Sequence, residues 1–300
     1  AFVHHERPFD DYAAQPLLPH RLSQTGPGLA IGDVDGDGLD DLYVGGAAGQ
    51  SGALYVQRAD GTFAERAGPW HEDVEHEDTG AVFVDHDGDG DLDLFVASGS
   101  VEAGERTERL RDRLYRNDGS AFSRAPGGAL PDVRRSSSVV AAADIDRDGD
   151  VDLFVGTRSR PGRYPESEGS LLLRNDGGRF VDATATLAPS LQQAGMVTAA
   201  TFTDIDGDGY PDLVVAAQWQ PLRALRNDGG AALVDATSSW FAAEPSGQWQ
   251  SLCAQDLDGD GDLDLIAGNL GLNTKYKAKP ARPLRLYAAD FDDSGSFDVV

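Results

Sequence analysis

Short apolar runs recur along the chain and predict short buried β-strands. Each run has three to five apolar residues, many of them β-branched or aromatic, with glycines nearby. One set of runs precedes an Asp-rich segment and spans residues 29–31, 81–84 and 139–142. A second set follows the Asp-rich segment and spans residues 42–44, 94–96, 153–155, 213–215 and 265–267. The repeating unit therefore begins with two buried strands that an acidic loop joins.

A second signature, Asn-Asp-Gly, ends a further apolar run at Asn117, Asn175 and Asn227, with a degenerate copy at residues 57–61. These residue types tolerate the positive φ angles of tight hairpins, so the signature predicts a turn between a third and a fourth strand. Four antiparallel strands repeated about every 50–60 residues predict the blades of an all-β propeller. A β-solenoid has a much shorter period, and independent modules need linkers that this sequence lacks, so both alternatives are less favoured.

The repeats divide the chain into an N-terminal segment, residues 1–28, and units that begin near residues 29, 81, 139, 199, 251 and 285. We expect a single β-propeller domain over residues 1–300, with six or seven four-stranded antiparallel blades. The fifth unit is short, and the sixth stops just after its acidic loop. Either the natural protein continues past Val300, or the N-terminal segment supplies closing strands.

The acidic loops share the nine-residue pattern Asp-x-Asp-x-Asp-Gly-x-x-Asp, and the last copy is weaker. Carboxylates at alternate positions of a tight loop repel one another unless a cation lies between them. Ca²⁺ takes six to eight oxygen ligands in flexible geometry, which suits the side chains at positions 1, 3, 5 and 9 and the carbonyl at position 7. Position 6 is always Gly, where the chain must turn sharply. Each loop is therefore a predicted Ca²⁺ site.

The predicted ligands occupy positions 1, 3, 5, 7 and 9 of each loop. In chain order they are Asp33, Asp35, Asp37, Leu39 and Asp41; Asp85, Asp87, Asp89, Asp91 and Asp93; Asp144, Asp146, Asp148, Asp150 and Asp152; Asp204, Asp206, Asp208, Tyr210 and Asp212; Asp256, Asp258, Asp260, Asp262 and Asp264; and Asp290, Asp292, Ser294, Ser296 and Asp298. Ser replaces Asp at position 5 of the last loop, so we expect five strong sites and a weaker sixth. An EF-hand does not fit, because position 12 is Val or Ala in the five full copies instead of a bidentate Glu.

The net charge of the chain supports the prediction of cation sites and excludes some classes of protein. The chain has 51 acidic and 25 basic residues, a net charge of -26 and a pI of about 4.3. The six loops hold 28 of the acidic residues, so much of the charge belongs to predicted ion sites. Such a chain repels the phosphates of nucleic acids. Its apolar runs are shorter than the roughly 18 residues of a membrane span, so we expect no span, and its 40% hydrophobic content does not fit a disordered acidic tail.

The loops and their flanking strands resemble FG-GAP/VCBS repeats, the calcium-binding blades of integrin α-chain propellers. More closely, the chain resembles bacterial secreted relatives of cartilage acidic protein, which often carry an ASPIC/UnbV segment. The matching stretches are residues 16–20 (PLLPH), 45–54 (GGAAGQSGAL), 195–198 (GMVT) and 268–273 (GNLGLN). The resemblance spans essentially the whole chain and implies a calcium-stabilised propeller outside the cytoplasm. It implies no reaction, because these repeats serve many functions.

The sequence favours a non-catalytic propeller that is secreted or exposed at the cell surface, although no signal peptide is present in the given chain. It would act as a scaffold or adhesion module with Ca²⁺ in a structural role. The three lysines, Lys275, Lys277 and Lys279, alternate along one segment and offer a strip that an acidic loop of another copy could bind, giving a homo-oligomer or polymer. A solvated loop is the simpler interpretation of this strip. An integrin-like module for a protein or glycan ligand is an alternative, with residues 99–113 and 157–170 as binding loops.

An extracellular enzyme acting on polysaccharide is the other alternative. His71, His76 and His86 lie near the acidic residues of 72–78 and offer a second metal or catalytic site. A solvated acidic loop is the simpler interpretation, and no Ser-His-Asp motif or nucleophile elbow occurs in the sequence.

Tryptophan and cysteine are two further residue types that could form a site. Trp219, Trp240 and Trp249 have the chemistry to stack on sugars, but we expect them to be buried aromatics of the blades. Cys253, the single cysteine, lies in an apolar strand-like segment and is expected to be a small buried hydrophobe rather than a nucleophile.

Overall fold

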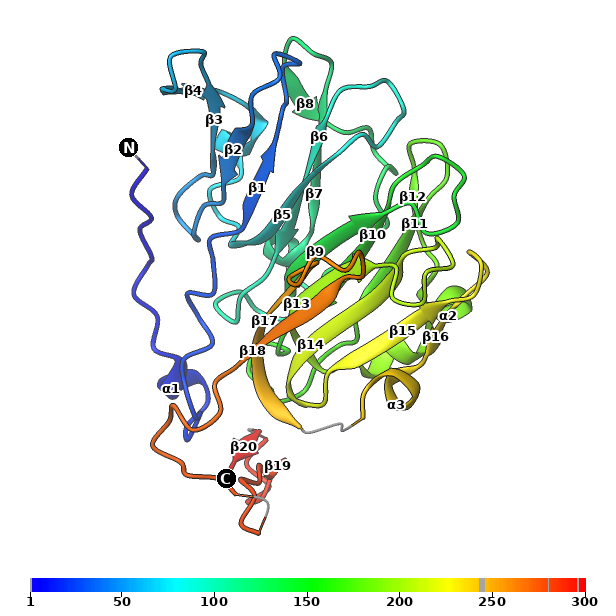
Figure 1. Cartoon of the computed structure of the whole chain (residues 1–300). Coiled ribbons are helices and arrows are strands. Elements are labelled where there is room, and N and C mark those ends of the chain that lie inside the picture. The colour runs from blue at the N-terminus through cyan, green and yellow to red at the C-terminus, as the bar shows by residue number, and fades with distance from the viewer. Residues whose placement is uncertain (1, 243–245, 280, 296) are drawn as a thin grey trace.

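The computed structural model describes residues 2–242, 246–279, 281–295 and 297–300, and the predicted ligand Ser296 lies outside these residues. Antiparallel sheets dominate the fold (Figure 1), and in the first three repeats each sheet has four strands that pair in sequence order. The strands of these sheets are β1 (Leu29–Gly32), β2 (Asp41–Val44), β3 (Ala53–Gln57) and β4 (Phe63–Arg66); β5 (Asp78–Val84), β6 (Asp93–Ser98), β7 (Arg113–Asn117) and β8 (Phe122–Arg124); and β9 (Ser137–Ala143), β10 (Asp152–Thr157), β11 (Leu171–Asn175) and β12 (Phe180–Asp182). The prediction of an all-β fold of four-stranded antiparallel sheets is confirmed.

The fourth repeat pairs its strands in the same order, and the fifth contributes two strands. β17 also pairs with the end of β14, which joins the two repeats into one sheet. β19 and β20 form a separate two-stranded sheet around the sixth loop. These strands are β13 (Met196–Thr203), β14 (Asp212–Gln220), β15 (Arg223–Asn227), β16 (Leu233–Asp235), β17 (Gly247–Gln255), β18 (Asp264–Asn269), β19 (Ala288–Ala289) and β20 (Asp298–Val299).

The helices of the described residues are short and lie in the N-terminal segment and in the connections between strands. They are α1 (Asp11–Ala14), α2 (Thr184–Leu187) and α3 (Thr237–Trp240), with 3₁₀ turns at η1 (Pro69–Glu72), η2 (Glu108–Leu110) and η3 (Pro189–Gln193). The sheets stand side by side through their first strands: β1 packs beside β5, β5 beside β9, β9 beside β13 and β13 beside β17. Blades of a β-propeller are arranged in the same way, with the first strand of each blade beside the first strand of the next.

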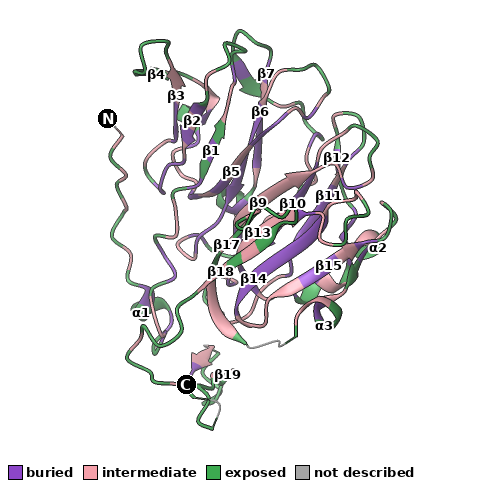
Figure 2. Ribbon diagram, viewed as in Figure 1, coloured by how far each residue is buried: buried purple, intermediate pink, exposed green. Residues whose placement is uncertain are grey.

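The second strands of the middle sheets are buried along their whole length. All six residues of β6 and all six of β10 are buried (Figure 2). Successive side chains of β6 enter different cores, with Leu94 packing between the first and second sheets and Phe95 between the second and third. Because a sheet covers each face, these strands are continuous apolar runs rather than alternating ones.

The first and fifth units are more open. On β1, Leu29 and Ile31 are 56% and 67% exposed, and on β18 Ile266 is 49% exposed. Cys253 on β17 pairs with Ile266 across the strands and is also exposed. The expectation that Cys253 is buried is therefore wrong, since its side of the β17–β18 pair is not covered by another sheet of the described chain.

The N-terminal segment packs against the last strands of the chain. Gln15 donates its side-chain N–H groups to the carbonyls of Tyr164 and Phe297, at 2.8 and 2.9 Å. Leu18 and Val299 share a buried cluster with Tyr164. Among residues 2–28 the structure contains α1 and no strand, so this part of the segment does not supply closing strands.

Candidate metal sites in the acidic loops

Each acidic loop joins the first strand of its unit to the second, so the loops lie at the same end of successive sheets. In the first loop, the N–H groups of Gly36 and Gly38 donate to the two carboxylate oxygens of Asp33, both at 2.8 Å. These hydrogen bonds hold the pKa of Asp33 below its usual value, with the bond from Gly38 contributing most. Gly38 has a φ of +85°, which explains the glycine at position 6. Corresponding bonds from position 6 are made to Asp85, Asp144, Asp204, Asp256 and Asp290.

In the first four loops, the position-9 carboxylate accepts hydrogen bonds from two sides, one from its own loop and one from a neighbouring strand. In the third loop, Asp152 is 1% exposed and accepts the N–H groups of Ile145 at 3.0 Å and Asn175 at 2.7 Å. The same two-sided arrangement recurs at Asp41, Asp93 and Asp212. Burial raises the pKa of Asp152 to about 7. A buried carboxylate that must ionise at neutral pH is stabilised by a cation held against it.

The side chains at positions 3 and 5 complete the clusters. Carboxylate oxygens from positions 1, 3 and 9 lie within 4.8 Å of one another in the first and third loops, and those from positions 1, 3 and 5 do so in the second. One oxygen each of Asp87, Asp144 and Asp146 is buried without a hydrogen-bond partner. Buried oxygens that lack a protein donor fit a hard divalent cation such as Ca²⁺, which takes oxygen ligands in flexible geometry.

Position 7 lies against position 5 in five loops. Its backbone N–H donates to the position-5 carboxylate at 2.8–3.1 Å. The donor and acceptor pairs are Leu39 with Asp37, Asp91 with Asp89, Asp150 with Asp148, Tyr210 with Asp208 and Asp262 with Asp260. In the sixth loop the N–H of Ser294 donates to Asp290 and Asp292. The described members of each predicted ligand set thus belong to one compact loop.

Two basic side chains contact the carboxylates of the second loop. His86 at position 2 is buried, and its Nδ1 contacts the position-9 carboxylate of Asp93. Arg116 from β7 pairs with Asp87 at 2.7 Å and with Asp89 at 3.0 Å. A guanidinium therefore shares two carboxylates of this loop, and His86 lies in the acidic loop rather than in a cluster with His71 and His76.

The Asn of the Asn-Asp-Gly signature connects neighbouring loops, a role that sequence reasoning missed. Asn117, Asn175 and Asn227 are at most 1% exposed. Their side-chain N–H groups donate to the position-2 carbonyls of the preceding repeat's loop, at Val34, His86 and Ile145, each at 2.8 Å. Their backbone N–H groups bind the position-9 carboxylates of their own loops. Each Asn thus links two adjacent acidic loops, and the recurring Asn-Asp-Gly signature is the sequence signal for this role.

The loops of the fifth and sixth units lack this support. Asp264 is exposed and accepts the N–H of Leu257 at 3.0 Å, without a third strand on its other side in the described chain. Asp298 accepts the N–H of Phe291 at 3.1 Å in the same way. The local loop geometry therefore persists where the neighbouring sheet does not.

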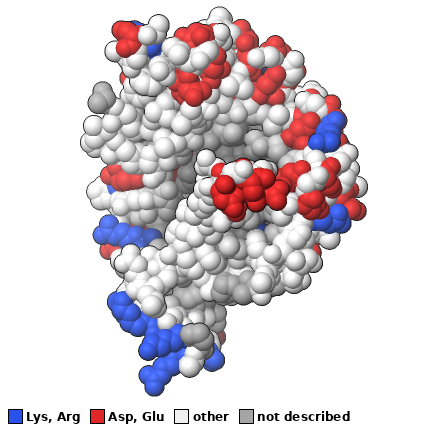
Figure 3. All heavy atoms as spheres, in the orientation of Figure 1, with Lys and Arg blue, Asp and Glu red and all other residues white. Residues whose placement is uncertain are grey.

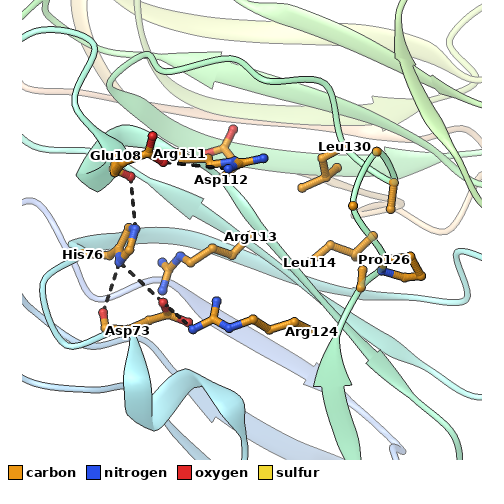
Figure 4. Close-up of a pocket in the computed structure, with 14 residues that line it drawn as sticks. Asp73, His76, Glu108, Arg111, Asp112, Arg113, Leu114, Arg124, Pro126 and Leu130 are labelled. Atoms are coloured by element: carbon orange, nitrogen blue, oxygen red, sulfur yellow. Dashed lines mark hydrogen bonds and ion pairs between the residues drawn. The ribbon is translucent and has the colours of Figure 1, made fainter.

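A pocket of about 350 Å³ contains the histidine that the enzyme alternative invoked (Figure 4). The ring nitrogens of His76 lie 3.2 Å from the carbonyl oxygens of Asp73 and Glu108. Asp73 accepts hydrogen bonds from Arg124 at 2.8 Å and from the hydroxyl of Tyr115 at 2.5 Å. His76, Asp73, Arg124 and Tyr115 therefore form one hydrogen-bonded network at this pocket.

The three tryptophans considered for sugar stacking, Trp219, Trp240 and Trp249, are half-buried rather than fully buried. Trp219 has a φ of +65° and donates its indole N–H to the hydroxyl of Tyr164 at 2.6 Å, while Trp240 and Trp249 are also of intermediate exposure.

Figure 3 shows acidic side chains in separate groups along the upper and right margins of the view, and basic ones gathered near the C-terminal end. Within that end, Lys277 donates to the carbonyls of Leu272 and Thr274 at 2.9 and 2.8 Å.

Family comparison gives the class to which these features belong. The model for the FG-GAP-like repeat matches residues 26–96, 97–155, 163–215 and 204–267. The chain therefore belongs to the FG-GAP-like repeat family, as its loops and strands indicated.

The curated relatives are cartilage acidic protein and integrin α-chains. Human cartilage acidic protein 1 is 28% identical over 159 residues, which cover 50% of this chain and 23% of the relative. Chicken integrin alpha-V is 30% identical over 173 residues, which cover 50% of this chain and 16% of the relative. The aligned part of the chain therefore spans less than a quarter of these two relatives.

The solved structures that match the chain have low sequence identity to it. An Agrocybe aegerita lectin that recognises non-reducing terminal N-acetylglucosamine is 19% identical, with 90% of this chain and 72% of that chain covered and a TM-score of 0.46. The Dos1 propeller is 10% identical, with coverages of 75% and 60% and a TM-score of 0.42. Within the described residues of our chain, no helix is long and apolar enough to cross a membrane.

Proposed function

We propose that this chain is a calcium-stabilised propeller module that acts outside the cell or at its surface, in a structural or ligand-binding role and not as an enzyme. The observation that carries the proposal is the repeated loop, in which aspartates from alternate positions converge, and in the second and third loops buried oxygens lack protein donors. Extracellular calcium-binding modules bind the ion at about 0.1–1 mM, so millimolar Ca²⁺ outside cells would fill such loops. Cytosolic calcium would leave them almost empty.

The ligand-binding part of the proposal concerns a basic surface depression of about 610 Å³. Arg106, Arg134, Arg135 and Arg160 line it together with Asp132 and Glu168, in a protein whose net charge is -26, and Arg134 pairs with Asp132. Arg160 pairs with Glu105 at 2.9 Å, which joins the connection after β10 to the one after β6. Guanidinium groups on fixed loops suit the carboxylate or sulfate groups of an acidic glycan or protein surface.

Calcium binding is the first test of this proposal. Isothermal titration of metal-free protein should show four or more Ca²⁺ ions per chain and little heat with Mg²⁺ at the same concentration. Fewer than two ions per chain would contradict the proposal. The substitution Asp146→Asn should remove the ion of the third loop, whereas Asp176→Asn, on an exposed turn outside the loops, serves as the matched control.

The ligand class is tested with calcium-loaded protein on a panel of neutral, carboxylated and sulfated glycans and of matrix proteins. Binding to acidic members that falls at least fivefold in the double variant Arg106→Ala/Arg135→Ala, and persists in Lys277→Ala, supports the proposed surface. Binding that both variants retain places the ligand elsewhere. Hydrolysis of a glycan that His76→Ala abolishes would instead establish the enzyme alternative.

Self-assembly into a polymer is the weaker form of this proposal. The lysine strip that motivated it is partly used within the chain, because Lys277 binds two carbonyls of its own segment. Lys275 lies over the ring of Tyr276 at 5.0 Å. Electron microscopy with and without Ca²⁺ tests assembly directly, and only discrete monomers in both conditions would exclude it.

A further inference from the structure

Four titratable side chains meet at the end of β5 that is opposite its acidic loop. Glu77 lies immediately before β5, and the Asp85 loop follows the other end of that strand. His4 and Glu6 come from the N-terminal segment, and Glu102 comes from the connection between β6 and β7. The N-terminal segment and Glu77 therefore bring one imidazole and two carboxylates together, and Glu102 lies close enough to interact electrostatically with Glu6 and Glu77.

The N-terminal segment is held in a register that turns His4 and Glu6 to the same side. The N–H of His5 donates to the side-chain oxygen of Gln50 at 2.7 Å, and the Gln50 amide donates to the carbonyl of Val3 at 2.8 Å. Along this stretch Val3 and His5 are exposed, whereas His4 and Glu6 are partly buried. The alternation is that of an extended chain with one side facing the protein.

The cluster is compact and incompletely hydrogen-bonded. Ligand atoms of His4, Glu6 and Glu77 all lie within 4.8 Å of one another, and His4 Nε2 is 2.6 Å from Glu6 Oε1. Glu77 is 2% exposed, and one of its oxygens accepts the N–H of Ala48 at 2.8 Å. Its other oxygen is buried with no partner, as are His4 Nδ1, Glu6 Oε2 and Glu102 Oε1.

Nearby arginines do not neutralise this cluster by direct contact. Arg7 and Arg109 both bind Glu75, at 3.0 and 2.7 Å. Among the described residues, no Lys or Arg makes an ion pair with Glu6, Glu77 or Glu102. Burial, together with the neighbouring carboxylates, raises the pKa of Glu77 to about 7. Buried carboxylate oxygens without donors or counter-charges are costly to hold together unless a cation joins them.

We propose that His4, Glu6 and Glu77, with Glu102 beside them, form a binding site for one divalent transition-metal ion. An imidazole with carboxylates is a mixed nitrogen and oxygen donor set, which suits Zn²⁺, Mn²⁺ or Fe²⁺ better than Ca²⁺. The site is distinct from the acidic loops in position, so it does not depend on the proposed calcium function. A bound ion would tie the N-terminal segment to the second repeat.

The test uses Co²⁺ and Zn²⁺ on tag-free protein in excess Ca²⁺, so that the acidic loops are saturated. Titration with Co²⁺ should give a visible d–d absorption that saturates at one ion per chain, and Zn²⁺ should displace it. The variants His4→Ala and Glu77→Gln should each weaken Co²⁺ binding at least tenfold. His5→Ala is the matched control and should bind as the wild type does.

A second measurement keeps the proposal testable if Glu77→Gln is poorly folded. Hydrogen exchange of the backbone amides of residues 3–7 should slow at least threefold when Zn²⁺ is added to the wild-type protein, and not in His4→Ala. Absence of a one-to-one Co²⁺ complex in the calcium-loaded wild type would overturn the proposal. Equal Co²⁺ affinity in the wild type and His4→Ala would also overturn it.

Discussion

The third and fifth acidic loops have the same ligand pattern in sequence and very different surroundings in the fold. In the third loop, Asp152 is buried and is bound on both sides, by Ile145 of the loop and Asn175 of β11. In the fifth loop, the corresponding Asp264 is exposed and is bound by Leu257 of the loop alone. The nine-residue pattern thus determines the hydrogen bonds within the loop. The neighbouring strands determine whether the position-9 carboxylate is buried and also bound by one of them.

The largest difference should appear when the position-9 carboxylate is removed. Asp152→Ala leaves two buried N–H groups without an acceptor, so we expect it to lower the free energy of unfolding by about 3–5 kcal/mol. Asp264→Ala leaves one exposed donor and should cost about 1 kcal/mol or less. Chemical denaturation in Ca²⁺ measures both values, and equal losses would show that burial of the loop does not matter.

The pH dependence of the metal-free protein should separate the two loops next. Because burial raises the pKa of Asp152 to about 7 in the folded chain, above the unfolded value near 3.9, its contribution to stability is fully present below about pH 4. That contribution is lost as the pH rises through 7 and the carboxylate ionises. The variant Asp152→Asn should therefore gain stability relative to the wild type between pH 5.5 and 8, by up to about 4 kcal/mol.

Denaturation of chelator-dialysed protein at several pH values measures this shift, with Asp264→Asn as the control. In saturating Ca²⁺ the gain should disappear, because the cation favours the ionised wild-type carboxylate. A gain of the same size in Ca²⁺ would mean that no ion binds near Asp152.

The Asn link should give a smaller, two-loop effect. Asn227→Ala leaves the buried carbonyl of Ile145 in the preceding loop without its donor, which should cost about 1–3 kcal/mol. It should also weaken Ca²⁺ binding by the third loop, although Asn227 is at least 75 residues away in sequence from every predicted ligand of that loop. The neighbouring exposed Asp228→Ala is the control. Calcium titration measures the affinity of the third loop in both variants. If neither variant changes that affinity, the proposed link is rejected.

Much of this could be foreseen from local pattern. The apolar run 42–44 corresponds to β2, and the acidic loops lie between first and second strands as expected. The burial of Asp152 could not be foreseen, because the loop pattern is the same where the residue is exposed. Asn175 contacts His86, which is 89 positions away in sequence. Glu77 lies beside His4, which is 73 positions away. Neither contact could be foreseen, because only the packing of the fold brings these residues together.

The smallest effect concerns the open side of the fifth unit. Because Cys253 is exposed on β17, it should react with a maleimide in the native protein at a rate close to that of a free thiol. Cys253→Ser should change the free energy of unfolding by less than about 0.5 kcal/mol. Mass spectrometry of the labelled, undenatured protein measures the reaction. Labelling that required denaturant would show that this face is covered in solution.

Thermal unfolding in calcium and in chelator is the most direct test of the claim that the acidic loops hold ions which stabilise the fold. If each loop binds Ca²⁺ at about 0.1–1 mM, each contributes roughly 1–2 kcal/mol at millimolar calcium. Calorimetry in 2 mM Ca²⁺ and in excess EGTA should therefore show a Tm at least about 10 °C lower without the ion, with 2 mM Mg²⁺ restoring little of it. An unchanged Tm would contradict the account.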